Sequence, residues 1–285
     1  MLSVGMLGNR LRKNFRHRKK WAKRQGLSCF RVYDHDIPEW PLSVDYLDEK
    51  VALRLGRNVE MHEETAEEIS AALDLQPEDV YWPGIGMQTH KVTECGHRFH
   101  LELGRSFDYG LFLDHRNLRS VVAEKVHGLS FLNLFCYTAS FTVYAAAGGA
   151  VHSHSVDLSK ANLAWAKTNF ELNGLGPEHE LIRADAMEYV RSSQDRFDII
   201  VCDPPTFSNS KRSANDFDVQ RSHPQLLNDC IRLLNPGGTL YFSNNSRKFR
   251  LDPDFTIAEE ITHQTIPQDF ERRPTHRCWE ISKFL

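Results

Sequence analysis

The segment DPPTF, from Asp203 to Phe207, carries the clearest chemical signal in the sequence. It follows the apolar run FDIIVC, so the acid stands where a buried strand is expected to end. The two prolines fix the backbone after the acid and make a rigid corner. A base that has flipped out of its stack can donate a hydrogen bond to the Asp203 carboxylate and lie against the Phe207 ring. We therefore interpret Asp203, Pro204, Pro205 and Phe207 as catalytic residues.

Two further acids also follow buried runs, Asp157 after SHSV and Asp185 after LIRA. Asp157 stands roughly 20 residues beyond a loop of small residues, where an acid accepts hydrogen bonds from the ribose hydroxyls of a bound nucleotide. Asp185 or its backbone can then read the exocyclic amine of adenine. A lone acid at a strand end is more often a helix cap, so the joint spacing carries this prediction.

The loop itself, from Cys136 to Ser140, brings backbone amides and a helix start toward the same cofactor. Ala139 stands near its middle, where a nucleotide-binding loop normally has glycine. A positive backbone torsion at this alanine would cost about 1 kcal/mol, so cofactor affinity depends on it. The residues that these elements predict for the cofactor pocket are Asn133, Phe135, Tyr137, Thr138, Ala139, Ser140, Asp157, Leu158, Asp185, Ala186 and Asp203.

The elements that position these residues alternate between strand and helix from Phe131 onward, which indicates a doubly wound α/β sheet. Five strands are expected within FLNLF, SHSVDLS, LIRADAMEYV, FDIIVCDPPTF and GTLYFSNN. The tail segments THQTIPQDF and HRCWEISKFL are expected to add an antiparallel hairpin at one edge. The prediction for residues 108–285 is thus a Rossmann-like domain with a seven-stranded mixed sheet.

Residues 1–107 are predicted to form a small α+β accessory domain. Strands are expected in CFRVYD, in VDYLDEKVALRL, at Val80 to Trp82 and at Arg98 to Leu103. The acidic helix HEETAEEISAALDL between them has a solvated face and is assigned no chemistry.

A strongly basic helix is expected at Arg10 to Arg24, although the formal net charge of the chain is -3. Its Leu11, Phe15 and Trp21 can dock it on the protein while the cations meet phosphates. A solvated helix, a membrane-surface helix or a protein contact remain alternatives. The residues predicted to contact RNA, including two from the polar loop after DPPTF, are Arg10, Arg12, Lys13, Arg16, Lys19, Lys20, Lys23, Lys211 and Arg212.

The composition excludes several classes of protein. With 41% hydrophobic and 26% charged residues the chain has the profile of a soluble globular protein. No apolar run approaches the roughly 18 residues of a membrane span, and the basic start does not fit a secretory signal. The six cysteines are scattered without a CxxC pair, so we expect neither disulfides nor a metal site. The expected location is the cytoplasm.

Eight segments of the chain resemble the K-type domain family of bifunctional large-subunit rRNA methyltransferases. They are NRLRKNFRHRKKWAKRQG, GLFLDHR, FLNLFCYTAS, SVDLS, NLAWAKTNF, DPPTFSNSKR, FDVQRSH and FSNNSRKFR, and the similarity spans nearly the whole chain. The resemblance implies S-adenosyl-L-methionine as cofactor and formation of 7-methylguanosine in 23S rRNA or a large-subunit precursor. Through GLFLDHR it also implies Phe112, Asp114 and Arg116 in the cofactor pocket. Members of the family usually have glycine at the position of Ala139.

The related domain that makes N(2)-methylguanosine is not present in this sequence, so the resemblance implies a stand-alone guanine-N(7)-methyltransferase, with a separate N(2)-guanine methyltransferase as a possible partner. The alternative is that the chain is a fragment or split product of a fused enzyme. Asp203 would orient the guanine and favour the cationic product, and Asn244 or Asn245 would hold an exocyclic oxygen.

Two alternatives stay open. Cytosine C5 methylation needs a cysteine thiolate that adds to the pyrimidine, and Asn244 stands where related enzymes have that thiol. Cys202 lies inside an apolar run, where a thiol is more often part of the core. A non-enzymatic RNA-binding or assembly factor that keeps the fold is the second alternative.

Overall fold

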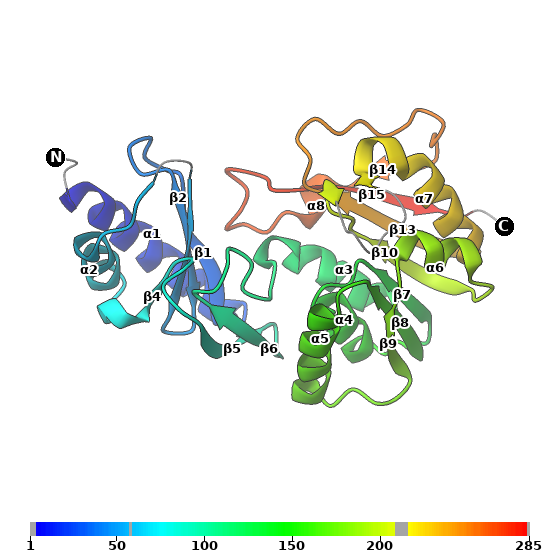
Figure 1. Cartoon of the computed structure of the whole chain (residues 1–285), viewed down its shortest axis with the longest axis horizontal. Helices are drawn as coiled ribbons and strands as arrows, with labels where there is room; N and C mark the ends of the chain where they lie inside the picture. Colours follow the sequence, from blue (N-terminus) through cyan, green and yellow to red (C-terminus); the bar gives the residue numbers. More distant parts are fainter. Residues whose placement is uncertain (1–3, 57–58, 209–215, 284–285) are drawn as a thin grey trace. The chain divides into compact units, whose positions relative to one another are not determined.

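A computed structural model describes residues 4–56, 59–208 and 216–283 of the chain (Figure 1). The chain divides into two units. The N-terminal unit comprises Met1–Leu113 and Gln268–Arg273, and the C-terminal unit comprises Asp114–Pro267 and Pro274–Leu285. The predicted division into independent domains after residue 107 stays a prediction.

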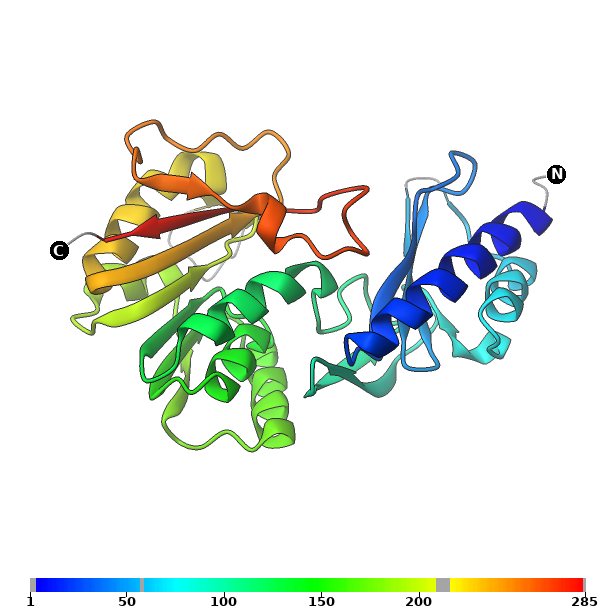
Figure 2. The same ribbon diagram turned by 180° about the vertical axis from the view of Figure 1, so that it is seen from behind.

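The N-terminal unit is built on a four-stranded sheet with a helical layer. The strands β1 (Cys29–Asp34), β2 (Leu42–Leu47), β3 (Val51–Leu55) and β4 (Val80–Tyr81) are neighbours in this order, and only β3 and β4 run parallel. The helices α1 (Val4–Arg24) and α2 (Glu63–Ala72) lie side by side beside the sheet, and the short helix η1 (Pro77–Asp79) leads into β4 (Figures 1 and 2). A separate hairpin joins β5 (Gln88–Glu94) to β6 (His97–Leu103). The strand β5 is absent from the sequence prediction because only Val92 and Glu94 of its residues are buried.

Helix α1 docks by one apolar face, as the sequence predicts. Leu7, Leu11, Phe15 and Ala22 are buried in the core of the N-terminal unit, and Trp21 packs against it partly exposed. Most of the basic side chains of the helix are exposed, since they occupy the other faces. Among the described residues, no helix has both the length and the apolar character that a membrane crossing requires.

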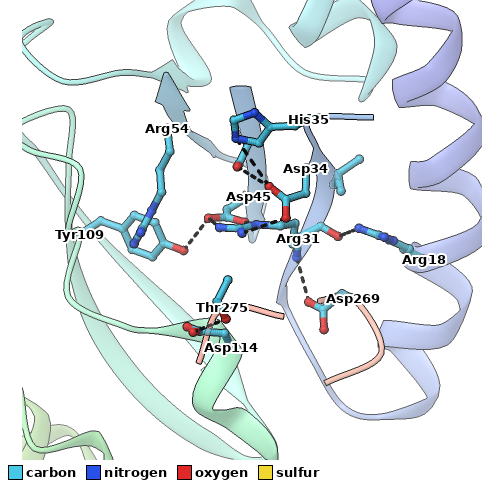
Figure 3. A network of polar contacts seen from close by, with 12 residues as sticks. Arg18, Arg31, Asp34, His35, Asp45, Arg54, Tyr109, Asp114, Asp269 and Thr275 are labelled. Atoms are coloured by element: carbon cyan, nitrogen blue, oxygen red, sulfur yellow. Dashed lines mark hydrogen bonds and ion pairs between the residues drawn. The ribbon is translucent and has the colours of Figure 1, made fainter. Parts of the chain in front are cut away.

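A buried ion pair holds the N-terminal sheet together (Figure 3). Arg31 on β1 donates from Nε and Nη2 to the two carboxylate oxygens of Asp45 on β2, at 2.8 and 3.1 Å. The Tyr109 hydroxyl donates to the same carboxylate at 3.0 Å. Burial alone would raise the pKa of Asp45, but the Arg31 charge and these hydrogen bonds hold that pKa below its usual value. Removal of either side chain would leave the other as an unpaired buried charge, which strongly destabilises a folded protein.

The segment Gln268–Arg273 belongs to this network although it comes from the tail of the chain. Asp269 accepts a hydrogen bond from the Arg31 amide at 2.9 Å, and the Phe270 ring lies 4.4 Å from the Arg31 guanidinium carbon. Arg18 of α1 donates to the Arg31 carbonyl. Arg31 is therefore in contact with the strand β2, the helix α1 and the segment Gln268–Arg273.

The C-terminal unit is a seven-stranded mixed sheet, as predicted. Its order is β14-β15-β13-β10-β7-β8-β9, and the five strands from β13 to β9 are parallel. The strands are β7 (Ser130–Leu134), β8 (His152–Asp157), β9 (His179–Arg183), β10 (Phe197–Cys202), β13 (Leu234–Asn244), β14 (Ala258–Glu260) and β15 (Arg277–Ser282). A separate pair, β11 (Phe207–Ser208) and β12 (Phe217–Asp218), follows the DPPT corner.

Helices cover both faces of this sheet, because successive side chains of each strand point to opposite sides. Leu132, Leu134 and Ile200 pack toward α6 (Ala186–Ser192) and α7 (Val219–Leu233). Phe131, Ile199 and Val201 pack toward α3 (Arg116–Lys125) and α4 (Ser140–Ala147). Helix α5 (Lys160–Asn173) connects β8 to β9. Strands buried on both faces explain the continuous apolar runs in the sequence.

The prediction of a strand over THQTIPQDF is wrong. Thr262–Thr265 forms the helix α8, and its carbonyl at Thr262 accepts a hydrogen bond from the Ile266 amide at 3.1 Å. The residues that follow leave the sheet for the N-terminal unit. The edge strand is instead β14, which pairs antiparallel with β15. Local turn hydrogen bonds and the burial of Phe270 outweigh the strand tendency of this segment.

The buried ion pair gives a first prediction. Asp45→Asn leaves the Arg31 charge without its partner and should lower the free energy of unfolding of the N-terminal unit by about 3 to 5 kcal/mol. Native-state hydrogen exchange of the β1 and β2 amides measures this loss directly. The control is Asp79→Asn, which removes a partner of Lys50 that is one quarter exposed and should cost less than about 1 kcal/mol. Equal losses of unfolding free energy in the two variants would contradict the stabilising role of the Arg31–Asp45 pair.

Candidate active site

The candidate site lies at the carboxyl edge of the C-terminal sheet. Strands β7, β8, β9, β10 and β13 are parallel, so all of them end at this edge. The chain runs outward from β7 through β8 to β9 and then returns to place β10 on the other side of β7. In open α/β sheets this change of direction opens the crevice in which ligands bind. The predicted loop and the DPPT corner follow the two strands that flank it.

The loop after β7 has an unusual backbone. Phe135, Tyr137 and Ala139 have φ values of 55°, 50° and 57°, in the left-handed region that favours glycine. Ala139 is the N-cap of α4, and its side chain is completely buried. Ala139 therefore has the positive φ that the sequence analysis considered. Such a conformation persists only where surrounding contacts enforce it.

Neighbouring elements supply those contacts. The Tyr137 amide donates to the Asp157 carboxylate at 3.0 Å, and Asn169 of α5 donates to the Thr138 carbonyl at 3.0 Å. The Cys136 amide donates to the Val156 carbonyl at 3.0 Å. The end of β8 and the helix α5 thus fix the loop conformation.

Both carboxylate oxygens of Asp157 accept hydrogen bonds from the protein. Its second carboxylate oxygen accepts hydrogen bonds from the Ser159 amide at 2.8 Å and from the Asn162 side chain at 3.2 Å. Burial raises the pKa of Asp157, and these hydrogen bonds oppose the rise. Each oxygen already has a donor from the protein, so its predicted contact with a ribose uses the remaining lone pairs and stays a prediction.

Asp185 is the N-cap of α6, because its side chain accepts from the amides of Met187 and Glu188 at 2.9 and 3.3 Å. One carboxylate oxygen makes both bonds. Its predicted role toward adenine stays a prediction, as do those of Leu158, Ser140 and the buried Ala186. Asn133 is buried and donates to Thr142 of α4 at 3.0 Å.

Asp203 points its carboxylate into a polar cluster behind the DPPT corner. One oxygen accepts from the Ser243 hydroxyl of β13 at 2.5 Å, and the other lies 3.4 Å from Nε2 of His115. Burial would raise the pKa of Asp203, but the His115 charge and the two hydrogen bonds lower it. About a quarter of the side chain, 26%, is exposed. Asp203 is therefore ionised, and its side chain is only partly buried.

His115 continues this cluster to a second carboxylate. Its Nδ1 lies 3.6 Å from Asp114, and Nδ1 of His276 lies at the same distance from the same carboxylate oxygen. Thr275 donates to Asp114 at 2.6 Å (Figure 3). Burial lowers the pKa of His115, but Asp203 and Asp114 raise it to about 10. Burial and the His115 charge lower the pKa of His276, so only one of the two rings is charged at neutral pH.

The cluster does not fit a metal ion, although Asp114, His115 and His276 offer ligand atoms within 4.8 Å of one another. The two imidazole rings are stacked, with centroids 4.2 Å apart and planes 18° from parallel. The lone pair of an imidazole nitrogen lies in the ring plane, so two stacked rings cannot direct both lone pairs at one ion at the roughly 2.0 Å of a metal–nitrogen bond. We assign the cluster to hydrogen bonding and charge pairing.

The sequence prediction includes Asp114 and Asp203 but misses His115, Ser243, Thr275 and His276. GLFLDHR contains His115 directly after Asp114, and HRCWEISKFL begins with His276. The connection is invisible in the sequence because β15 runs antiparallel, so that its first residue meets the ends of the parallel strands.

The outer side of the corner carries the other predicted groups. Phe207 is 53% exposed and Pro205 is also exposed, whereas Pro204 is buried. Thr206 donates to the Asn245 side chain at 2.5 Å, so Asn245 stands beside the corner and is exposed. Asn244 is buried, and its oxygen accepts from the Ser246 amide at 3.1 Å. Of the two amides, Asn245 is thus the accessible one.

For the remaining predicted residues a role in the site stays a prediction. Phe112 belongs to the N-terminal unit, where its ring is 6.0 Å from the Arg54 guanidinium carbon. Arg116 is buried at the start of α3. Lys211 and Arg212 lie outside the described residues. Arg12, Lys13, Arg16, Lys19, Lys20 and Lys23 are exposed on α1, and Arg10 is partly exposed.

The comparisons with known proteins agree with this fold. A family model described as S-adenosylmethionine-dependent methyltransferase matches residues 76–274. Ribosomal RNA large subunit methyltransferase K of Neisseria meningitidis serogroup B is 42% identical, over 99% of this chain and 88% of its own. Ribosomal RNA large subunit methyltransferase K/L of Vibrio cholerae serotype O1 is also 42% identical, over 96% of this chain. The chain spans only 43% of that longer relative.

Two solved structures share the fold over 99% of this chain and 82% of theirs. One is the putative methyltransferase SMU.776 complexed with SAH, with a TM-score of 0.79 and 24% identity. The other is a putative SAM-dependent methyltransferase from Streptococcus mutans, with a TM-score of 0.81 and 23% identity. At these identities the likeness concerns the fold alone.

The left-handed backbone of Ala139 gives a prediction. Ala139→Gly should raise the free energy of unfolding by about 0.5 to 1 kcal/mol, because glycine adopts this torsion without strain and loses part of the gain to chain entropy. Chemical unfolding followed through the C-terminal unit measures the change. The control is Ala145→Gly within α4, where the same replacement should be destabilising by about 1 kcal/mol. A loss of stability in both variants would show that Ala139 is not strained.

Proposed function

Because the chain belongs to the S-adenosylmethionine-dependent methyltransferases, in the family of ribosomal RNA large subunit methyltransferase K, we propose that it forms 7-methylguanosine in 23S rRNA. The observation that carries the proposal is the DPPT corner, which contains the ionised, partly exposed Asp203 and is followed by the exposed Phe207. The substrate is either naked rRNA or a large-subunit precursor. A separate enzyme for N(2)-methylguanosine remains a prediction, since the K/L relative is more than twice as long as the matched part.

The residues at the carboxyl edge fit the cofactor. The loop from Phe135 to Ala139 is held in one conformation, and Asp157 and Asp185 keep unused lone pairs at the ends of β8 and β9. In the proposal Asp157 accepts from the ribose and Asp185 lies near the adenine. When bound, S-adenosylmethionine supplies an electrophilic methyl group. In the proposal the loop and the two acids would hold the cofactor so that this methyl group faces the corner after β10.

Methylation of guanine N7 makes few chemical demands on the protein. N7 carries an in-plane lone pair, so no group has to be deprotonated, and catalysis consists of alignment and of support for positive charge. The Asp203 carboxylate accepts hydrogen bonds from the amine edge of the base and favours the cationic product. Phe207 stacks on the base, and the Asn245 amide donates to the exocyclic oxygen. These are the groups that the corner exposes.

The buried state of Cys202 argues against cytosine C5 methylation. That reaction needs a thiolate next to the base. Cys202 is part of the apolar core, and burial raises the pKa of its thiol well above the usual value. A protonated core thiol is not a nucleophile. Asn244 occupies the end of β13 without a thiol, so guanine methylation accounts for the site better.

Helix α1 supports the choice of RNA as substrate. Its apolar face is buried, and six of the predicted contact residues expose their cations on the other faces. Cations in this arrangement attract phosphates irrespective of base sequence. We propose that α1 holds the RNA while the corner acts on the base.

The direct test is nucleoside mass spectrometry of unmodified 23S rRNA after incubation with the protein and isotopically labelled S-adenosylmethionine. We expect labelled 7-methylguanosine. Labelled 5-methylcytidine would replace the proposal by the cytosine reaction. No label from a protein that binds both cofactor and RNA would favour a non-enzymatic RNA-binding factor.

The role of α1 has its own test. Replacement of Lys19, Lys20 and Lys23 by alanine should weaken RNA binding and reduce the slope of log affinity against log salt by about 2 to 3, because each lost phosphate contact removes about 0.7 to 0.9. Titrations at several salt concentrations measure the slope. The control variant replaces Lys160 and Lys167, two exposed lysines of α5. An unchanged slope in the α1 variant would exclude the helix from the RNA contact.

A further inference from the structure

A buried histidine connects the corner to the interior of the C-terminal unit. His115 is 6% exposed and lies between two carboxylates, with Nε2 toward Asp203 and Nδ1 toward Asp114. These carboxylates come from segments far apart in sequence, one before α3 and one after β10. The described contacts of His115 therefore join the acid of the corner to an acid that lies behind it.

We propose that His115 is a positioning residue that fixes the Asp203 carboxylate in the orientation that receives the base. This inference rests on the proposed function, because it assigns Asp203 to the side of the methyl acceptor. Ser243 holds one oxygen of Asp203 at 2.5 Å, and His115 faces the other at 3.4 Å. Two donors on the inner side fix the plane of the carboxylate. In the proposal the remaining lone pairs of the carboxylate accept hydrogen bonds from the base.

The position of His115 is itself determined by its surroundings. His276, before β15, stacks on the ring, and Phe141 of α4 meets its edge with centroids 5.8 Å apart. Nε2 of His276 pairs with the Thr265 hydroxyl at 3.0 Å, while Thr275 anchors Asp114. Ser243 also lies 3.4 Å from Nε2 of His115. Segments before α3, on α4, on β13 and before β15 thus combine to place one imidazole.

Asp114 and Asp203 lie within 4 Å of His115, and the stacked His276 ring, whose pKa is lowered, is neutral at pH 7. Both carboxylates raise the pKa of His115, so its charge and the stability it contributes are fully present below pH 6.5 and are lost as the pH rises through about 10. The pKa of Asp203 is lowered, so its carboxylate persists until the pH falls below the usual range for aspartate. The pair therefore stays ionised from about pH 5 to pH 9.

His115→Gln is the decisive variant, because glutamine can still donate a hydrogen bond but carries no charge. We expect kcat for rRNA methylation to fall by about ten- to a hundredfold, as for a misplaced catalytic group. KM for rRNA and the Kd for S-adenosylmethionine should stay within about threefold. The acid limb of the pH profile should move to higher pH, since Asp203 loses the charge that lowers its pKa. If His115 only stabilised the fold, the substitution would not move the acid limb of the pH profile, and it would not lower kcat while KM and Kd stay unchanged.

The control is His152→Gln, which removes an exposed histidine of β8 in the same unit and should leave kcat and the pH profile unchanged. An unchanged pH profile and kcat in His115→Gln would overturn the proposal. Loss of cofactor binding would overturn it as well, because His115 would then serve the cofactor site.

Two further measurements cover a His115→Gln protein that fails to fold. Ser243→Ala removes the other inner donor to Asp203 and should lower kcat with the same acid shift, to a smaller degree. Nitrogen NMR of histidine-labelled wild-type protein at pH 7.5 should show both ring nitrogens of His115 protonated, and a neutral ring would overturn the proposal. This spectrum requires no turnover, so a neutral His115 ring can be told apart from a failure of the proposed function, which shows as the absence of 7-methylguanosine.

Discussion

The ionised carboxylate of Asp203 is the group on which the rest of the active unit depends. Burial favours its neutral form, so the fold has to supply compensating donors and a compensating charge. Parallel β10 delivers the acid to the carboxyl edge, β13 delivers Ser243 beside it, and antiparallel β15 begins where those strands end. The segment before α3 adds His115. The mixed character of the sheet is therefore a requirement of the site.

The N-terminal unit solves the same electrostatic problem for a structural purpose. Arg31 and Asp45 are buried together, and their hydrogen bonds reach Tyr109, Asp269 and Arg18. Removal of one partner leaves a buried charge, whereas in the intact pair the charges of Arg31 and Asp45 compensate each other. In the C-terminal unit two carboxylates share one charged histidine, and the cluster keeps a net negative charge. In the proposed function, this negative charge favours a base that becomes cationic.

Most of the fold follows from the sequence because apolar runs and their alternation with helices are local signals. The five parallel strands, the basic helix and the acids at strand ends are all visible in this way. The strand β5 and the helix α8 are not, because few side chains of β5 are buried and α8 depends on tertiary contacts. His115 and His276 lie 161 residues apart, and only the antiparallel strand β15 brings them into a stack. The sequence shows that Ala139 replaces the expected glycine of the loop, but only the structure shows that its φ is positive.

The central claim is that Asp203 serves the methyl acceptor while Asp157 serves the cofactor. It is tested most directly by calorimetric affinity for S-adenosylmethionine, measured beside rRNA methylation, in Asp203→Ala and in Asp157→Ala. The account predicts that Asp203→Ala keeps its cofactor affinity within about threefold and loses methylation, a change of less than about 0.7 kcal/mol in binding. Asp157→Ala should lose affinity for the cofactor itself. A loss of cofactor binding in Asp203→Ala would contradict the account and return Asp203 to the cofactor site.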